Sequence, residues 1–222
     1  MTLRAIFFGS IGTLVETSDI QRRAFNRAFA EAELDWNWST ETYKLLLTKS
    51  GGRNRIQDFA NQQGINVDAK MLHQRKTEIF DAFMADGNVP LRLGINNVIQ
   101  FAKENDIQLA FVTSTSQANI DTVFSAIGSQ VKRDDFAFIG NDAMVNKPKP
   151  SPEIYTKALS HLGLKTQSCI AVEDTGTSMR AALAAGIRCI AFPGAYAAAQ
   201  DFSGALLTTS CLSLDHFRTP EH

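Results

Sequence analysis

Short apolar runs mark the strands expected in this sequence. They lie at 3–8, 109–113, 136–139, 169–172 and 189–192. Their short length and apolar composition are typical of strands buried on both faces. After residue 89 these runs alternate with segments of helical periodicity, at about 94–105, 117–127, 152–163 and 177–185. Such alternation predicts right-handed crossovers and a parallel sheet.

The stretch between the first strand and the others has a different pattern. From about residue 18 to residue 88 the periodicity is helical, and Ser39 or Thr40 is placed to cap one of the helices. Helices are expected at about 53–63 and 68–86, with Gly64 between them. We therefore predict a doubly wound α/β core formed by 1–16 and 89–222, with a helical cap inserted at 17–88.

Composition excludes several classes of protein. The net charge is -1 with 44% hydrophobic residues, and the basic residues form no run, which argues against nucleic acid or an anionic membrane as a partner. Three cysteines without a CxxC pair argue against disulfides and structural zinc. No apolar run reaches the roughly 18 residues of a membrane span. We expect a soluble, cytoplasmic protein.

Chemistry is expected where the parallel strands end. In open α/β sheets, ligands bind outside the carboxyl ends of the strands. The segments that follow the predicted strands are 9–13, 113–116, 140–147 and 173–177. They contain several polar residues that could contact an anion, among them Ser114, Thr115, Lys147, Glu173 and Asp174.

These segments resemble the four motifs of the haloacid dehalogenase superfamily. The chain is most similar to the branch that holds beta-phosphoglucomutase and the CbbY-type sugar-bisphosphate phosphatases. The resemblance rests on four short stretches, which are Gly12-Thr13-Leu14, Val112-Thr113-Ser114, Lys147-Pro148-Lys149-Pro150 and Val172-Glu173-Asp174. Each stretch is weak alone, but four in order at strand ends, with helices after the first, are specific.

The first motif departs from the family pattern. Members of this family carry Asp-x-Asp-Gly-Thr-Leu, in which the first Asp attacks phosphorus and the second is general acid and base. Here the two positions hold Gly9 and Ile11, which have no carboxylate. Consecutive strand side chains point to opposite faces, so we expect the hydroxyl of Ser10 to point away from the site. No catalytic residue of the family mechanism is intact.

The resemblance implies that the anion-binding half of the site remains. Ser114 or Thr115, Lys147 and the backbone N–H groups of 9–13 are the candidate phosphate contacts. Arg53 and Arg55 in the cap are candidate contacts to the distal part of a ligand. Glu173 and Asp174 are the remaining metal-ligand candidates, and because Mg²⁺ needs several hard oxygens, we expect weak or no metal binding in the free protein. Lys147 has a second interpretation, as a buried ion pair with Asp174 or Glu173.

Three functions are compatible with these residues. The first is a catalytically inactive protein that binds phosphate or a sugar phosphate between cap and core. The second is a sugar-phosphate phosphatase with residual or altered chemistry, which uses water directly with Asp174 or Glu173 and Lys147. The third is a structural or partner-binding protein, whose partner the sequence does not indicate. We favour the first, because inert residues stand at both catalytic positions.

Overall fold

The computed structural model describes residues 2–47, 51–85 and 89–218, and the chain divides into two compact units. The α/β unit comprises Met1–Glu16 and Asn88–His222. The helical unit comprises Thr17–Gly87. The two crossings between the units meet in the α/β unit, where Val15 and Leu91 form an isolated antiparallel bridge.

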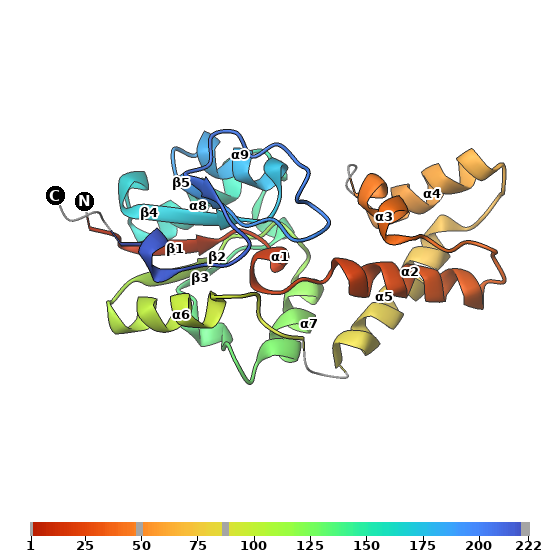
Figure 1. Ribbon diagram of the computed structural model, residues 1–222, viewed down its shortest axis with the longest axis horizontal. Helices are drawn as coiled ribbons and strands as arrows, with labels where there is room; N and C mark the ends of the chain where they lie inside the picture. Colours follow the sequence, from red (N-terminus) through yellow and green to blue (C-terminus); the bar gives the residue numbers. More distant parts are fainter. Residues whose placement is uncertain (1, 48–50, 86–88, 219–222) are drawn as a thin grey trace. The chain divides into compact units, whose positions relative to one another are not determined.

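A six-stranded sheet forms the centre of the α/β unit, and every pair of neighbouring strands is parallel (Figure 1). The spatial order is β3-β2-β1-β4-β5-β6. The strands are β1 (Ala5–Phe8), β2 (Gln108–Phe111), β3 (Phe138–Ile139), β4 (Cys169–Glu173), β5 (Arg188–Ala191) and β6 (Leu207–Thr208). The predicted α/β class is confirmed, while β6, with two residues, gave no signal in the sequence.

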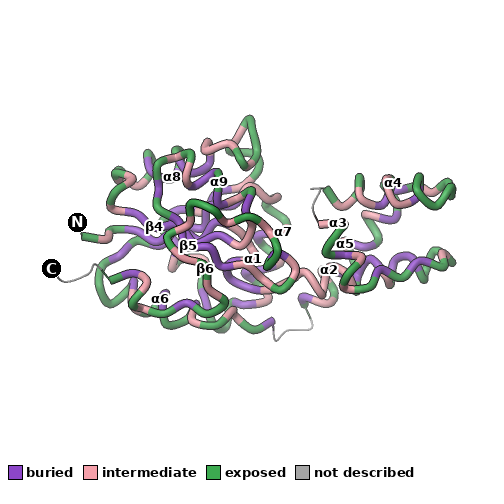
Figure 2. Tube along the Cα trace, turned by 45° about the horizontal axis from the view of Figure 1, so that its top comes forward, coloured by how far each residue is buried: buried purple, intermediate pink, exposed green. Residues whose placement is uncertain are grey.

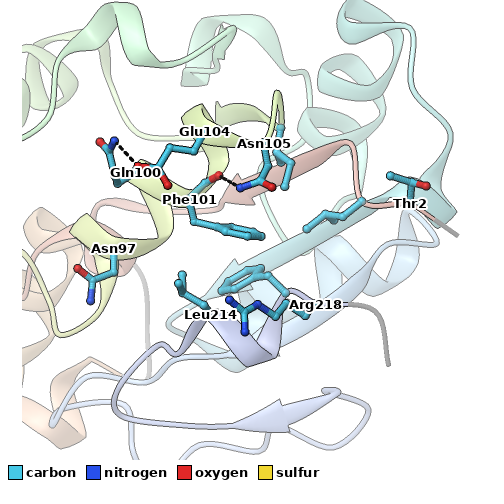
Figure 3. A pocket seen from close by; sticks show the side chains of 11 residues that line it. Thr2, Asn97, Gln100, Phe101, Glu104, Asn105, Leu214 and Arg218 are labelled. Carbon is cyan, nitrogen blue, oxygen red and sulfur yellow. Dashed lines mark hydrogen bonds between the residues drawn. The ribbon is translucent and has the colours of Figure 1, made fainter. Parts of the chain in front are cut away.

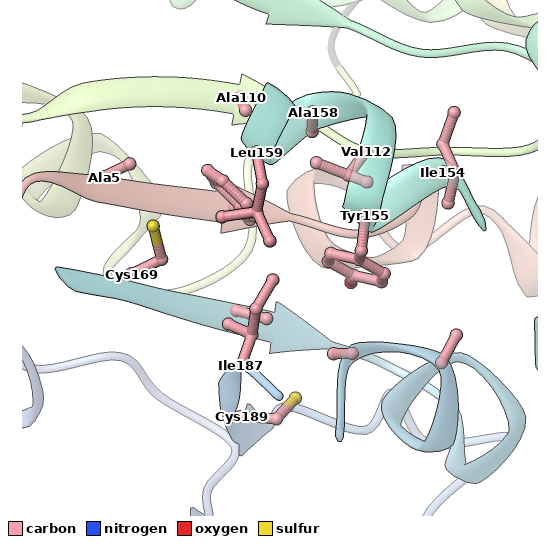
Figure 4. Close-up of a cluster of buried hydrophobic side chains, with 14 of the residues drawn as sticks. Ala5, Ala110, Val112, Ile154, Tyr155, Ala158, Leu159, Cys169, Ile187 and Cys189 are labelled. Carbon is pink, nitrogen blue, oxygen red and sulfur yellow. The ribbon is translucent and has the colours of Figure 1, made fainter. Parts of the chain in front are cut away.

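Helices cover both faces of this sheet. They are α6 (Ile95–Glu104), α7 (Gln117–Ile127), α8 (Glu153–Leu162) and α9 (Gly176–Ala184). In Figure 1, α8 and α9 lie over one face and α6 and α7 over the other. The apolar cluster under α8 and α9 contains Phe7, Ala110, Tyr155 and Ala171, all fully buried (Figure 4). Short 3-10 helices lie at Arg133–Asp135, Asp142–Met144, Thr166–Ser168 and Leu214–His216.

The helical unit consists of α2 (Ser18–Glu31), α3 (Thr40–Leu46), α4 (Gly52–Gln63) and α5 (Ala69–Ala85). An aromatic core holds it together, with Trp38 fully buried and its ring centroid 4.7 Å from that of Phe29 and 4.8 Å from that of Phe25. In Figure 2, buried residues alternate with exposed ones along these helices. Among the described residues, no helix is both long and apolar enough to cross a membrane.

Ser39, one of the two capping residues that the sequence suggested, caps α3. Its hydroxyl accepts a hydrogen bond from the backbone N–H of Thr42 at 3.1 Å. Replacement Ser39→Ala should lower the free energy of unfolding by about 1 kcal/mol, because the N–H loses its acceptor. A chemical denaturation titration measures this loss. The variant Ser39→Asp, which can accept the same bond, should remain within a few tenths of a kcal/mol of the parent. Equal losses in both variants would contradict the capping role.

Candidate functional site

The carboxyl ends of β1, β2 and β4 form the floor of the candidate site. Phe8 is in register with Phe111 on β2 and with Val172 on β4, so the chain leaves all three strands at one edge of the sheet. Gly9 follows β1 and donates its N–H to the carbonyl of Val172 at 3.0 Å. A four-residue helix, α1 (Ile11–Leu14), begins directly after Ser10.

Lys149 lies at the centre of this edge. Its ammonium is 2.6 Å from Glu173 Oε1 and also donates to the carbonyl of Gly9. The Lys149 side chain is 6% exposed and the Glu173 side chain is fully buried. Tyr155, on α8, donates its hydroxyl to the same Oε1 at 2.5 Å. The Lys149–Glu173 ion pair, with Tyr155 as a further donor, is therefore buried next to Gly9 at this edge of the sheet.

The lysine at this sheet edge is Lys149, not the expected Lys147. Lys147 is exposed, and its backbone N–H donates to Glu153 Oε2 at 3.0 Å. The sequence contains two overlapping Lys-Pro-x-Pro stretches, because Lys149-Pro150-Ser151-Pro152 follows the first by two residues. Only the second stretch brings its lysine to the strand ends. The buried-ion-pair interpretation proposed for Lys147 applies to Lys149 instead.

Ser10 does not point away from the site as expected. Its hydroxyl donates to Asp174 Oδ1 at 2.7 Å. The alternation of side chains holds within β1, which ends at Phe8. Beyond that point Ser10 is the residue before α1, and its direction follows the entry to that helix rather than the pleat of the sheet.

Glu173 occupies the space that a side chain at residue 9 would need. A Cβ built on Gly9 would lie 2.0 Å from Glu173 Oε1 and 2.5 Å from Oε2. Oε2 is buried and has no hydrogen-bond partner in the described part of the chain. The carboxylate at this edge therefore comes from β4 instead of from the residue after β1. It fills the space next to the backbone of Gly9, the position at which the motif that this sequence resembles has its first aspartate.

Burial dominates the acid–base properties of this edge. It raises the pKa of Glu173, against the attraction of Lys149. It also raises the pKa of Asp174, against the hydrogen bond from Ser10 and the charges of Lys149 and Arg92. Burial raises the pKa of Tyr155 well above its ordinary value, so that its phenol keeps the proton that it donates to Glu173.

Arg92 is a residue of this edge that no motif in the sequence indicated. Its guanidinium donates to the carbonyls of Gly12 at 2.7 Å, Phe192 at 2.6 Å and Pro193 at 2.7 Å. It also stacks on the ring of Phe192, at 3.5 Å from the ring centroid. Arg92 thus fastens the loop after β1 to the loop after β5 and brings a positive charge toward Asp174.

The hydroxyls after β2 differ in their availability. Thr115 Oγ1 accepts from the side-chain amide of Asn119 at 2.9 Å, and Ser116 caps α7. Ser114 is half-buried, and its hydroxyl has no hydrogen-bond partner within the described residues. Both hydroxyls named from the sequence therefore keep an O–H that could donate to an anion, and that of Ser114 makes no competing hydrogen bond.

The residues present do not fit a divalent metal well. Glu173 and Asp174 are adjacent carboxylates, but residues 9 and 11 add no third acid. In the part of the chain that the structure describes, no cluster of three or more His, Cys, Asp or Glu side chains is arranged to hold a metal. Mg²⁺ prefers octahedral sets of oxygen ligands. Weak or absent metal binding remains a prediction.

The two arginines named in the helical unit have different surroundings. Arg53 is exposed. Arg55 donates its Nε to the carbonyl of Leu46 at 2.9 Å, and its guanidinium lies 5.6 Å from the ring centroid of Tyr43. A role in ligand binding remains a prediction for both residues.

An open hollow elsewhere in the α/β unit does not contain these residues (Figure 3). Thr2 and Leu3, just before β1, line it together with Asn105 and Ile107, just before β2. It therefore lies at the amino ends of the strands. The polar groups described above lie at the carboxyl ends, where ligands bind in sheets of this kind.

Comparison with known proteins identifies close relatives. Residues 12–192 match the family model described as haloacid dehalogenase-like hydrolase. The protein CbbY of Cereibacter sphaeroides is 41% identical over 206 residues, which cover 91% of this chain and 90% of that protein. The protein CbbY of Rhodobacter capsulatus is 38% identical over 208 residues, which cover 92% of each.

Solved structures agree with this similarity. The crystal structure of CbbY from Rhodobacter sphaeroides in complex with phosphate superimposes with a TM-score of 0.82 at 39% identity, over 95% of each chain. A mutant of the same protein, in complex with xylulose-1,5-bisphosphate, gives the same values. A putative beta-phosphoglucomutase from Thermotoga maritima, at 19% identity and a TM-score of 0.77 over 93% of this chain and 94% of that one, shares the fold.

Proposed function

The chain belongs to the haloacid dehalogenase-like hydrolase family, and from that premise we propose that it binds the phosphate group of a small sugar phosphate without the aspartyl-phosphate turnover of its relatives. The observation that carries the proposal is the composition of one sheet edge. Lys149 and the free hydroxyl of Ser114 follow strands that end together, while Gly9 and Ile11 supply neither nucleophile nor general acid.

The absence of an acid at residue 9 favours binding over chemistry. A carboxylate there would repel a phosphate dianion, and its removal is worth on the order of 1–4 kcal/mol at 4 Å, depending on the local dielectric. Glu173 does not replace the nucleophile, because Lys149 and Tyr155 hold its Oε1. Its carboxyl carbon would lie 2.1 Å from a Cβ at residue 9, so it fills the space of that Cβ and not the space beyond it where an aspartate carboxylate would lie.

The ligand class is proposed from the relatives. The CbbY structures contain phosphate in one case and xylulose-1,5-bisphosphate in the other. Four-tenths identity over almost the whole chain makes a pentose bisphosphate the first ligand to test. A pentose monophosphate and inorganic phosphate are the comparisons that separate recognition of the sugar from recognition of the phosphate alone.

Thermal melts of the purified protein test this function. Ligand at a hundred times its dissociation constant should stabilise the protein by about 2.7 kcal/mol, a rise in Tm of roughly 5–10 °C. Ser114→Ala should weaken binding roughly tenfold or more, because a hydrogen bond to a charged group contributes about 1.5–3 kcal/mol.

Lys147→Ala is the matched control. The Lys147 side chain is exposed, and the hydrogen bond from its backbone N–H to Glu153 does not need that side chain. It should bind with the affinity of the parent. If neither the pentose phosphates nor inorganic phosphate shifts the Tm, the proposed function is refuted. Loss of binding in Lys147→Ala together with normal binding in Ser114→Ala would place the anion elsewhere.

A further inference from the structure

We infer that phosphate binding at this sheet edge requires no divalent metal, because Lys149 and Arg92 already balance the two carboxylates that remain there. This inference rests on the proposed function, since it concerns the same site. It has three supports, which are the placement of charges, the state of the carboxylate oxygens, and the space around Gly9.

One ion pair is in direct contact at the sheet edge, and Arg92 adds a second positive charge there. The Lys149 ammonium is 2.6 Å from Glu173 Oε1. The Arg92 guanidinium, fixed by the carbonyls of Gly12 and Phe192, acts on Asp174 and also on Glu16 at the end of the loop. A divalent cation added here would face two carboxylates that are already partly neutralised. An incoming phosphate would contact the Lys149 ammonium, which is already in place without a divalent cation.

Hydrogen bonds engage one oxygen of each carboxylate. Glu173 Oε1 accepts from Lys149 and from Tyr155, and Asp174 Oδ1 accepts from Ser10. The oxygens left for a metal are Asp174 Oδ2 and Glu173 Oε2, and the latter is buried without a partner in the described chain. A carboxylate with an ammonium 2.6 Å from its other oxygen is a weak ligand for Mg²⁺, which holds tightly to its water ligands.

The space around Gly9 removes the remaining donor position. A side chain at residue 9 would be the third acid of the set, and Glu173 fills the volume that its Cβ would need. The Gly9 carbonyl, a further oxygen at this edge, accepts from Lys149. The ammonium therefore occupies the contacts that a cation would make at this end of β1.

Calorimetric titration of inorganic phosphate into the whole protein tests the inference. One titration is made in EDTA and the other in millimolar Mg²⁺. We expect the same dissociation constant within about twofold. Binding that is confined to the Mg²⁺ titration, or that is tightened there roughly tenfold or more, would overturn the inference and leave the proposed function standing. No binding in either titration would refute the proposed function itself.

The variant Asp174→Asn gives an independent readout in the same two buffers. If no metal takes part, loss of one carboxylate reduces repulsion, and phosphate should bind in EDTA as tightly as in the parent or more tightly. If a metal bridges Asp174 and the phosphate, the variant should instead lose affinity in Mg²⁺. That loss would also contradict the inference.

Discussion

Lys149→Met should lower the free energy of unfolding by about 3–5 kcal/mol. Removal of one partner of a buried ion pair leaves the other charge without compensation in a medium that solvates it poorly. Glu173 is fully buried, and without Lys149 only the hydroxyl of Tyr155 would remain on its Oε1. Methionine keeps most of the length of the side chain, so the loss reports on the charge and not on a cavity. Urea denaturation followed by circular dichroism measures it.

Lys147→Met is the control for this experiment. The same residue type lies two positions earlier and is also followed by proline, but it is exposed, and its replacement should change stability by less than about 0.5 kcal/mol. Equal effects of the two substitutions would mean that the Lys149–Glu173 pair contributes nothing specific.

The loss in Lys149→Met should also depend on pH. Burial raises the pKa of Glu173, and removal of the lysine raises it further. A carboxyl group with a raised pKa in the folded state takes up a proton as pH falls, and its cost then disappears. The difference in stability between variant and parent should therefore shrink from about pH 8 toward about pH 5. A difference that grows over this range would contradict the assignment of the unpaired charge to Glu173.

The elements of this fold could be predicted because their signals are local. Strands β1, β2, β4 and β5 are apolar runs within one or two residues of their expected limits, and α7 has the limits that its periodicity indicated. Several short elements could not be predicted, among them β6 and α1. Strand β6 is too short to carry a pattern, and α1 is one turn whose Gly12-Thr13 pair favours a turn equally well.

The arrangement of the site depends on contacts that local patterns do not contain. Two lysines in overlapping Lys-Pro-x-Pro stretches are equivalent in sequence, and the path of the loop decides between them. Glu153, at the start of α8, accepts from the N–H groups of Asn146 and Lys147 and holds that part of the loop away from the sheet edge. Lys149 is thereby placed beneath Gly9. This selection depends on hydrogen bonds between the loop and the first residue of α8.

The role of Glu173 could not be predicted for a related reason. The sequence shows that residue 9 has lost its side chain, but not what fills the space. A neighbouring strand supplies the carboxylate, and the register of β1 against β4 brings the two positions together. The same register brings Asp174 within reach of Ser10. The effect of a substitution at a packed site can therefore be inferred only when the residues on the adjacent strands are considered with it.

Gly9→Asp should destabilise the protein by several kcal/mol and should restore no phosphatase activity. The backbone at Gly9 does not require glycine, since its φ is not in the left-handed region. The obstacle is Glu173, whose Oε1 would lie 2.0 Å from the new Cβ. Overpacking of a buried site costs about 1–3 kcal/mol, and a second carboxylate about 4 Å away adds up to about 4 kcal/mol at an intermediate dielectric. Urea denaturation and release of phosphate from a chromogenic phosphate ester measure the two effects.

A double-mutant cycle shows whether Glu173 is the cause. Glu173→Ala removes both the clash and the second charge, so the double variant Gly9→Asp/Glu173→Ala should be more stable than Gly9→Asp alone, with the new aspartate as the counterion of Lys149. A favourable coupling free energy larger than about 0.5 kcal/mol between the two substitutions would show that the new aspartate takes the place of Glu173. Additive effects would mean that the two positions are independent. Phosphate release should be absent throughout the cycle, because Ile11 supplies no general acid in any of these proteins; turnover by Gly9→Asp alone would show that the inert residue at 11 does not prevent catalysis.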